Sequence, residues 1–432
     1  GKNLEPLFEC ILQTVLPPLV EEGPLQMMVS NLDYDNYKGK VAIGRIYRGR
    51  LAPHDAVAIV DGEGRITHHE VDQVFTYLGL ERIEVDEALA GDIVAVTGFD
   101  EVGIGDTVTS PDQPEALPGI RVGDPTVKMT FGVNTSPFAG REGQYCTSRH
   151  LRGRLYKELE TNISLRVEET DSPDVFLVSG RGELHLAILV ETMRREGYEF
   201  QVSKPEAITK VVAGVLLEPV ELLEIETVSE YVGILTELLS KRQARLTDMR
   251  HDGQGNVHMA FRVPTRGLIG FRGAFLTATR GEGVMNTLLL GYEPWAGEIV
   301  STRSGALVAA AEGVAVTYGL NNAQGRGVTF IEPGTLVYEG MIVGLNSRGN
   351  DLPVNVCKEK KQTNIRSSTS DIAIKLAPPV KMSLEQALDF INDDELVEVT
   401  PQNIRLRKKL LTQHERLRAA SHAARKEAQN GS

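Results

Sequence analysis

The sequence predicts a multidomain α+β protein: a β-barrel, two ferredoxin-like sandwiches and a strand-rich C-terminal unit that ends in a helix. Three observations support this prediction. The chain has 432 residues, which is enough for about three domains, and short apolar strands separated by Gly, Asp and Pro fill its first quarter. The order strand, helix, strand, strand, helix, strand then occurs twice. Near the end, two capping signals precede helices.

The first predicted domain is a β-barrel over residues 20–117. Several short strands with turn residues between them are typical of a closed barrel. The Pro-rich stretch 111–118 indicates a linker after it. The predicted strands cover residues 41–47, 56–60, 66–75 and 93–96.

Two ferredoxin-like βαββαβ sandwiches are predicted over residues 118–205 and 206–297. In the first, Gly180 and Gly182 allow a sharp turn between a buried strand and an amphipathic helix that ends at Gly197. A Gly-x-Gly turn that opens a helix can cradle a phosphate, but Arg181 is its only basic residue and a third glycine is missing, so we favour simple packing. The predicted elements are strand 127–131, helix 148–159, strands 163–167 and 175–178, helix 183–196 and strand 198–202, then strand 220–227, helix 232–240, strands 244–249 and 256–263, helix 268–279 and strand 285–290.

The last predicted unit covers residues 298–432. Short apolar runs with glycines up to residue 343 indicate further strands. Ser383 and Gln386 form a capping box in front of a helix that runs to about residue 391, and Thr412 and Glu415 form another in front of the terminal helix.

Composition restricts the classes of partner. The formal charge of −13 repels a polyanion at long range, so nucleic-acid contacts require local basic patches. The most apolar run, residues 305–316, is short and contains Glu312, so no membrane segment is predicted. Cys10, Cys146 and Cys357 are far apart, which indicates neither a disulfide framework nor a zinc site. We expect a cytoplasmic protein.

No catalytic constellation is predicted, and no site for metal or GTP. The Gly-Lys pairs that begin at Gly1 and Gly39 are not followed by Ser or Thr, so the phosphate-binding loop Gly-x-x-x-x-Gly-Lys-Ser/Thr is absent from this sequence. Residues 1–19 contain an apolar helical stripe that ends at Pro17-Pro18, with no upstream sequence to bury it. We expect it to be the last helix of a further domain.

A polar basic segment covers residues 358–370. It has four positive side chains and one negative one, and small hydroxyl and amide side chains between them. Such a segment suits contacts with RNA phosphates and sugars, and a solvated loop is an equally weighted interpretation. The candidate RNA-binding residues are Lys358, Lys360, Lys361, Thr363, Asn364 and Arg366.

A second basic patch lies in residues 404–418. On a strand, Arg405 and Arg407 point away from Ile404 and Leu406, which predicts an exposed arginine pair that could bind phosphate. The alternative pairs these residues with the acidic run 389–398, and we favour it for about half of the set. The candidates are Arg405, Arg407, Lys408, Lys409, Arg416 and Arg418, of which Arg416 and Arg418 are expected to be free.

Two groups of motifs carry a family resemblance. The stretch Ser179-Gly-Arg-Gly-Glu-Leu-His-Leu186 resembles the third-domain signature of ribosomal translocation factors such as elongation factor G and LepA. Residues 358–366, 382–390, 393–401 and 404–409 resemble the C-terminal domain peculiar to the BipA (TypA) family of translational GTPases. The resemblance implies that residues 298–432 are that domain, and that the three preceding predicted domains are counterparts of domains II, III and V.

The same resemblance implies partners and a role. GTP and Mg²⁺ would bind in an N-terminal GTPase domain missing from this sequence, so these residues alone should hold no cofactor and hydrolyse no GTP. The expected partners are the 70S ribosome, rRNA and the A-site tRNA, which the segment 358–370 would approach. The expected role is in large-subunit assembly and translation under stress. Gln362 and Ile365 depart from the family pattern, which has Leu and Met there.

Two alternatives stay open. A regulatory or assembly scaffold would bind proteins without contacting RNA, and its binding would depend little on salt. A stand-alone hydrolase would need a catalytic set that the sequence does not show.

Overall fold

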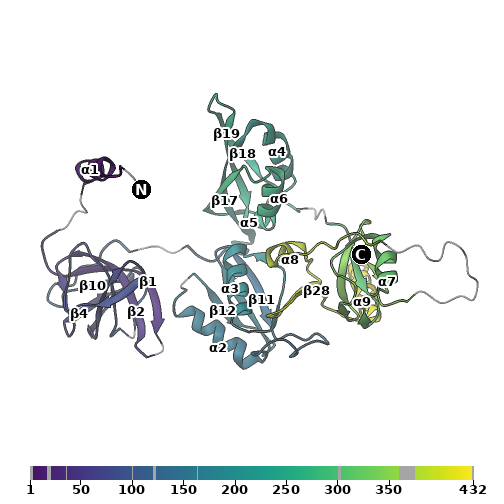
Figure 1. Ribbon diagram of the computed structural model, residues 1–432, viewed down its shortest axis with the longest axis horizontal. Helices are drawn as coiled ribbons and strands as arrows, with labels where there is room; N and C mark the ends of the chain where they lie inside the picture. Colours follow the sequence, from purple (N-terminus) through teal and green to yellow (C-terminus); the bar gives the residue numbers. More distant parts are fainter. Residues whose placement is uncertain are drawn as a thin grey trace, which may run out of the picture. The chain divides into compact units, whose positions relative to one another are not determined.

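The computed structural model describes residues 3–16, 21–35, 37–99, 101–119, 123–162, 164–299, 303–359 and 375–430 (Figure 1). The chain forms two compact units, residues 1–123 with 155–165 and residues 124–154 with 166–432. Strands make up most of the regular structure in the two units, as expected for a multidomain, strand-rich protein.

The smaller unit is built from short strands that follow one helix, α1 (Glu5–Thr14). Eight strands pair in the order β5-β4-β10-β1-β2-β9-β6-β7, and β3 pairs with β8. Their apolar side chains bury a large cluster that includes Met27, Val29, Ile46 and Val94, and a small one of Val41, Phe75 and Ala95. The strands are β1 (Gln26–Asp35), β2 (Gly39–Arg48), β3 (Arg50–Leu51), β4 (Ala56–Val60), β5 (Ile66–Glu70), β6 (Val74–Leu78), β7 (Glu81–Glu84), β8 (Ala88–Leu89), β9 (Ile93–Val96) and β10 (Thr107–Thr109).

The closed barrel expected from the sequence is not found in the described part of this unit. The pairing order ends at β5 on one side and β7 on the other, and these two strands do not pair. The single strand expected over residues 66–75 is also two strands. The chain changes partner between them, because Val71 exchanges backbone hydrogen bonds with the 54–55 turn, whereas Asp72 donates to Thr97.

Helix α1 buries none of its side chains. Leu7, Phe8 and Leu12, on its apolar stripe, are 54%, 56% and 82% exposed. The stripe that the sequence predicts therefore forms a helix, and no described residue covers it. Its predicted end at Pro17-Pro18 lies outside the described residues.

The larger unit begins with a first α/β module, except for its residues 155–165, which are grouped with the smaller unit. Its four main strands pair in the order β12-β13-β11-β14, and β15 (Glu206–Ala207) pairs with β11. The elements follow the predicted order, although β12 starts later than expected. They are β11 (Val127–Gly132), α2 (Ser148–Leu159), β12 (Arg166–Glu169), β13 (Val175–Gly180), α3 (Glu183–Arg195) and β14 (Phe200–Val202).

A second α/β module has the same element order. β17 pairs with β16, β19 and β20, and β18 pairs with β19. Helices α4 and α6 lie beside this sheet (Figure 1), where Leu235, Leu239, Phe271 and Phe275 share its buried cluster. The elements are β16 (Lys210–Val212), β17 (Val215–Val228), α4 (Val232–Ser240), β18 (Arg245–His251), β19 (Asn256–Pro264), α5 (Thr265–Leu268), α6 (Phe271–Ala278) and β20 (Val284–Pro294), with a 3₁₀ turn at Ser229–Tyr231.

The helix predicted over residues 268–279 is broken in this module. Gly270 has φ +69°, a left-handed conformation that interrupts helical hydrogen bonding and separates α5 from α6. This backbone conformation is the reason for glycine at this position.

The C-terminal module continues the sheet of the first α/β module. β14 pairs with β27, and the order then runs β28-β25-β21-β26, so one sheet of 11 strands spans the two modules. An edge strand with open hydrogen-bonding groups is thereby covered. The elements are β21 (Ala306–Ala309), β22 (Gly313–Val314), α7 (Thr317–Gln324), β23 (Gly327–Thr329), β24 (Leu336–Val337), β25 (Met341–Asn346), β26 (Leu352–Val354), α8 (Leu384–Phe390), β27 (Glu395–Val399), β28 (Ile404–Lys408) and α9 (Gln413–Asn430).

The two capping boxes predicted from sequence are confirmed. The Ser383 hydroxyl accepts from the Gln386 N–H, and the Gln386 side chain accepts from the Ser383 N–H at 2.9 Å. Thr412 and Glu415 make the same reciprocal bonds in front of α9.

Within the described ranges, no helix has the length and apolar character needed to cross a bilayer.

Candidate nucleic-acid interface

The candidate RNA-binding residues fall into three structural groups, apart from Arg416, which is only half-exposed. Lys358, Lys409 and Arg418 are exposed. Arg405, Arg407 and Lys408 are withdrawn from solvent. The remaining members of the polar segment, Lys360, Lys361, Thr363, Asn364 and Arg366, lie outside the described residues, so their interpretation stays a prediction.

The expectation of an exposed arginine pair is wrong. The Arg405 side chain is 11% exposed, and Arg407 is 2% exposed. Strand β28 is an inner strand between β27 and β25, and side chains on both of its faces are withdrawn from solvent: Leu406 and Lys408, like the two arginines, are buried or nearly so. Alternation along the strand therefore does not send either arginine to water. Both side chains are part of the interior of the described structure.

Arg405 is held between two carboxylates. Its Nη1 lies 2.9 Å from Oε1 of Glu398, which is directly opposite on β27, and its Nη2 pairs with Glu142. Burial alone would lower the pKa of Arg405, but Glu398 and Glu142 raise it above its usual value. Arg405 is therefore a fixed cation inside an ion-pair network.

Arg407 and Lys408 have different partners on the same strand. Arg407 donates from Nη2 to Thr135 Oγ1 at 2.7 Å, and burial lowers its pKa. The Lys408 ammonium lies 2.8 Å from Asp394 Oδ2 and from Glu395 Oε1. The alternative that paired the basic strand with the acidic run is thus confirmed for Arg405 and Lys408.

The loop at residues 133–145, which completes this network, was not predicted from the sequence. Glu199, in the first α/β module, fixes the loop by accepting from the N–H groups of Gly140 at 2.7 Å and Gly143 at 2.9 Å. At the loop's centre, Phe138 packs edge-on against Tyr338 of the C-terminal module, with ring centroids 5.0 Å apart. The loop thus joins the two modules through apolar and charged contacts.

Glu142 is the polar anchor of the loop. Burial would raise the pKa of this carboxyl, but hydrogen bonds from Thr400 and Asn403 and the pairing with Arg405 hold the pKa below its usual value. The Tyr338 hydroxyl donates to Glu398 Oε2 at 2.7 Å. Burial, and to a smaller extent the Glu398 carboxylate, raise the pKa of Tyr338. The Arg405–Glu398 pair could have been predicted from the register of the β27–β28 hairpin, but no sequence signal indicated Glu142 as a partner.

The exposed candidates come from separate segments of the C-terminal module, and Lys358 lies after β26. Lys409 follows β28, and Arg418 is on α9. Arg416 was expected to be free, but it is only half-exposed, and its Nη1 donates to the carbonyl of Leu410 at 3.0 Å and to that of Leu411. The described candidates that remain accessible are Lys358, Lys409 and Arg418.

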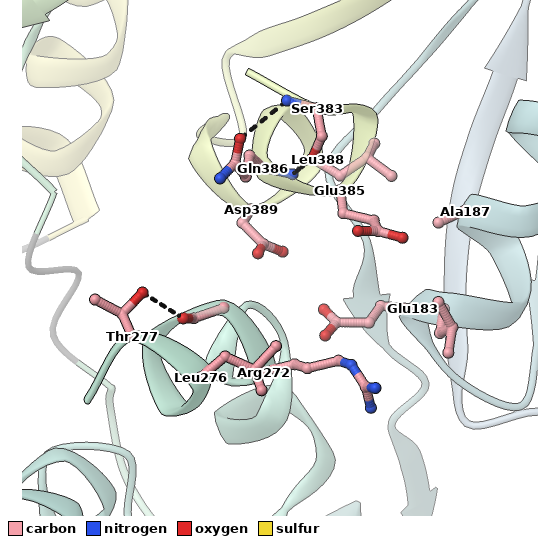
Figure 2. A pocket seen from close by; sticks show the side chains of 12 residues that line it. Glu183, Ala187, Arg272, Leu276, Thr277, Ser383, Glu385, Gln386, Leu388 and Asp389 are labelled. Atoms are coloured by element: carbon pink, nitrogen blue, oxygen red, sulfur yellow. Dashed lines mark hydrogen bonds between the residues drawn. The ribbon is translucent and has the colours of Figure 1, made fainter. Parts of the chain in front are cut away.

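A cavity of about 280 Å³ lies elsewhere in the larger unit, and the sequence did not predict it. Helices α3, α6 and α8 surround it, and the carboxylates of Glu183, Glu385 and Asp389 point into the same space (Figure 2). Leu276 and Leu388 form part of its apolar wall. In the described part of the chain, no group of His, Cys, Asp and Glu side chains has the arrangement of a metal site.

Family models match three parts of the chain. The model "Elongation factor G domain 2" matches residues 24–111, "Elongation factor G C-terminus" matches 215–303, and "TypA/BipA C-terminal domain" matches 304–413. Relatives named "Large ribosomal subunit assembly factor BipA" match nearly the whole chain. The Synechocystis protein is 50% identical over 409 residues, which are 94% of this chain and 68% of the relative.

The chain belongs to the BipA family. The Bacillus subtilis BipA is 48% identical over 421 residues, and the Haemophilus influenzae BipA is 50% identical over 421 residues. In each case the match covers 97% of this chain, and it covers 69% and 68% of the relative. The BipA C-terminal match contains β27 and β28, so the Arg405–Glu398 and Lys408–Glu395 pairs lie within it, whereas Glu142 lies outside it.

Proposed function

We propose that this chain is the ribosome-binding portion of a BipA-type translational GTPase and that it acts in assembly of the large ribosomal subunit. The observation that carries the proposal is the match of about half of all positions to proteins named as large-subunit assembly factors, over nearly the whole chain. The location would be the cytoplasm. GTP and Mg²⁺ would bind in a GTPase domain, which the exposed apolar stripe of α1 would contact.

The proposed domain boundaries are those expected from sequence: 20–117, 118–205, 206–297 and 298–432, after a helix in 1–19. The family-model matches 24–111 and 304–413 fall inside two of these domains and support them, whereas the match 215–303 extends six residues past the boundary at 297. For the smaller unit we retain a barrel-like domain II, and for the two α/β modules ferredoxin-like domains III and V. The repeated strand orders in the two modules support the latter.

Contact with RNA is proposed to come from the polar segment 358–370 together with the accessible Lys358, Lys409 and Arg418. These exposed cations lie in the C-terminal module, whereas the chain as a whole is acidic. A local patch of this kind can neutralise phosphates despite the unfavourable net charge. The rRNA and the A-site tRNA are the proposed RNA partners, and stress-dependent translation is the proposed setting.

Co-sedimentation with 70S ribosomes across a salt series tests this proposal. Three variants are compared with the natural chain: the triple change K360E/K361E/R366E, the double change K409E/R418E, and the control K241E/R245E/R250E. The control removes the same charge as the triple variant from exposed positions of the second α/β module.

We expect binding of the natural chain to fall by about 10³-fold or more between 50 and 200 mM salt if about six phosphates are contacted. Each lost phosphate contact should reduce the salt slope by about 0.7–0.9. Both site variants should weaken binding more than the control does. Shallow salt dependence with unchanged binding of all variants would instead favour the protein-binding scaffold.

A further inference from the structure

The cavity bounded by α3, α6 and α8 lies where three modules of the larger unit meet. α3 belongs to the first α/β module, α6 to the second, and α8 to the C-terminal module. Two of the carboxylates that point into it, Glu183 and Asp389, come from different modules (Figure 2). The chemistry of this junction is separate from the basic patches of the proposed RNA interface.

The turn at Gly270 is hydrogen-bonded on one side and closely approached by a side chain on the other. Its N–H donates to Oε2 of Glu183 at 2.8 Å, across from α3. On the α8 side, the approach of Asp389 is so close that a Cβ placed on Gly270 would lie 3.2 Å from the carboxyl carbon of Asp389. Residues of the first α/β module and of the C-terminal module thus both pack against one turn of the second α/β module.

One guanidinium faces these two carboxylates. Arg242, which follows α4, donates from Nη1 to the carbonyls of Gly267 at 2.8 Å and Ile269 at 2.9 Å, so its position beneath the turn is fixed. It interacts favourably with both Glu183 and Asp389. When both carboxylates are ionised, one fixed cation faces two anions.

The other charged groups around the junction do not remove this imbalance. Glu221 of β17 and Glu385 of α8 add negative charge near Glu183 and Asp389 respectively. Arg272 of α6 is a further cation on the cavity wall. Among the described residues, the charged groups that act on the two carboxylates are Arg242, Glu221 and Glu385, and Arg272 lines the same cavity.

Protonation of the pair is favoured by this environment. Burial, and then the neighbouring Asp389, raise the pKa of Glu183 to about 7, against opposing contributions from the Gly270 N–H and Arg242. Burial also raises the pKa of Asp389 to about 6, with Arg242 opposing and Glu385 adding to the rise. A neutral Glu183 can still accept the Gly270 hydrogen bond through its carbonyl oxygen.

We propose that this junction is a proton-dependent latch: a proton on Glu183 or Asp389 allows α3 and α8 to hold the Gly270 turn, and ionisation of both carboxylates loosens the second α/β module. The sign follows from linkage. A carboxyl whose pKa is raised in the joined arrangement binds more protons there than in the loosened one, so raising the pH favours loosening. The loosening should occur mainly between about pH 5 and pH 7, and it should be complete above this range.

The size of the effect follows from the same shifts. Each tenfold difference in proton affinity between the two arrangements changes their equilibrium tenfold at high pH. Because the two sites interact, their shifts do not simply add. We therefore expect the joined arrangement to lose stability by about tenfold to a hundredfold between pH 5.5 and pH 8.5.

Pulsed electron spin resonance distance measurements on the full chain test the latch. The three native cysteines are replaced by Ser, and spin labels are attached at I188C on α3 and I234C on α4. Both positions are exposed, at 57% and 46%. We expect a narrow distance distribution at pH 5.5 that becomes broader or longer at pH 8.5, with a midpoint between pH 6 and pH 7.

Two variants give the decisive comparison. E183Q/D389N removes both ionisable groups with little change of shape, so its distribution should stay narrow at both pH values. E237Q makes one of the same changes on an exposed carboxylate of α4, and should respond to pH as the natural chain does. A natural chain that is unresponsive to pH, or a response retained in E183Q/D389N, would overturn the proposal.

A third variant tests the contact independently of charge. G270A forces a Cβ toward Asp389 and places alanine at a φ of +69°, which alanine rarely adopts. The distribution should then be broad already at pH 5.5. A narrow distribution in G270A at that pH would show that the turn does not hold the modules together, and would also overturn the latch.

Discussion

Replacing Lys408 by Met should destabilise the larger unit strongly, although the side chain keeps its length. The Lys408 side chain is 2% exposed and pairs with Asp351, Asp394 and Glu395. Methionine fills the same space without charge, so the change isolates the ion pairs from the packing. Glu395, which is fully buried, would lose one of its two cationic partners.

The magnitude can be worked from the exposure of the three carboxylates. Removing one member of a buried ion pair costs about 3–5 kcal/mol. Asp351 and Asp394 are 39% and 64% exposed, so each contributes at most about 1 kcal/mol. Glu395 retains Arg303, whose two nitrogens lie 2.5 and 2.9 Å from it. The loss should therefore be near the lower limit, about 3 kcal/mol, or a decrease of about 6–12 °C in the unfolding midpoint.

Thermal unfolding followed by circular dichroism measures this loss, and Trp295 fluorescence provides an internal comparison. Trp295, the only tryptophan, stacks at 3.7 Å on Arg266 in the second α/β module. Its signal should change less than the circular dichroism if the modules unfold in separate steps. Lys409→Met is the matched control. The Lys409 side chain is next in sequence and is exposed, so its replacement should change the free energy of unfolding by less than about 0.5 kcal/mol.

The pH dependence of this variant has a defined sign. Burial would lower the pKa of Lys408, but Asp351, Asp394 and Glu395 raise it above the usual lysine value. Its contribution is therefore complete at neutral pH and lost only as the pH rises through the folded-state pKa. A Lys408→Met midpoint equal to that of Lys409→Met at pH 7 would refute the reasoning.

Three further changes probe other parts of the structure. Ser383→Ala removes a capping hydroxyl and should cost about 1 kcal/mol, visible as faster amide hydrogen exchange in α8. Gly44→Ala places a Cβ 2.0 Å from the carbonyl oxygen of Met28 and should cost about 3 kcal/mol or more in urea unfolding of the smaller unit. Glu142→Gln should lower the unfolding midpoint at pH 7. This difference should shrink as the pH falls below 4, because Arg405 and its other partners stabilise only the ionised carboxylate.

Local sequence signals predicted individual elements well. The two capping boxes, and helix α3 after the turn at Gly180 and Gly182, were predicted correctly. Each of them depends on residues only a few positions apart. The broken helix at Gly270 shows the limit of such signals. The apolar period continues through residues 268–279, whereas the backbone turns at one glycine to meet Glu183.

The buried ion pairs were only half predictable. A four-residue turn between β27 and β28 sets Glu398 opposite Arg405 and Glu395 opposite Lys408, and this register follows from the hairpin itself. Burial of these pairs requires β14 on one side of the hairpin and β25 on the other. Such pairings join strands far apart in sequence, and no local pattern encodes them.

The sequence by itself determined the family, the order of most elements, the helix caps and the acidic balance of the chain, because these properties belong to residues or to short segments. Only the tertiary structure decided which basic residues face water. Arg405, Arg407 and Lys408 have the composition of a phosphate site, but the surrounding strands and the loop at 133–145 enclose them. A charge removed from water must be neutralised within the protein, so burial turned these residues into internal ion-pair and hydrogen-bond partners.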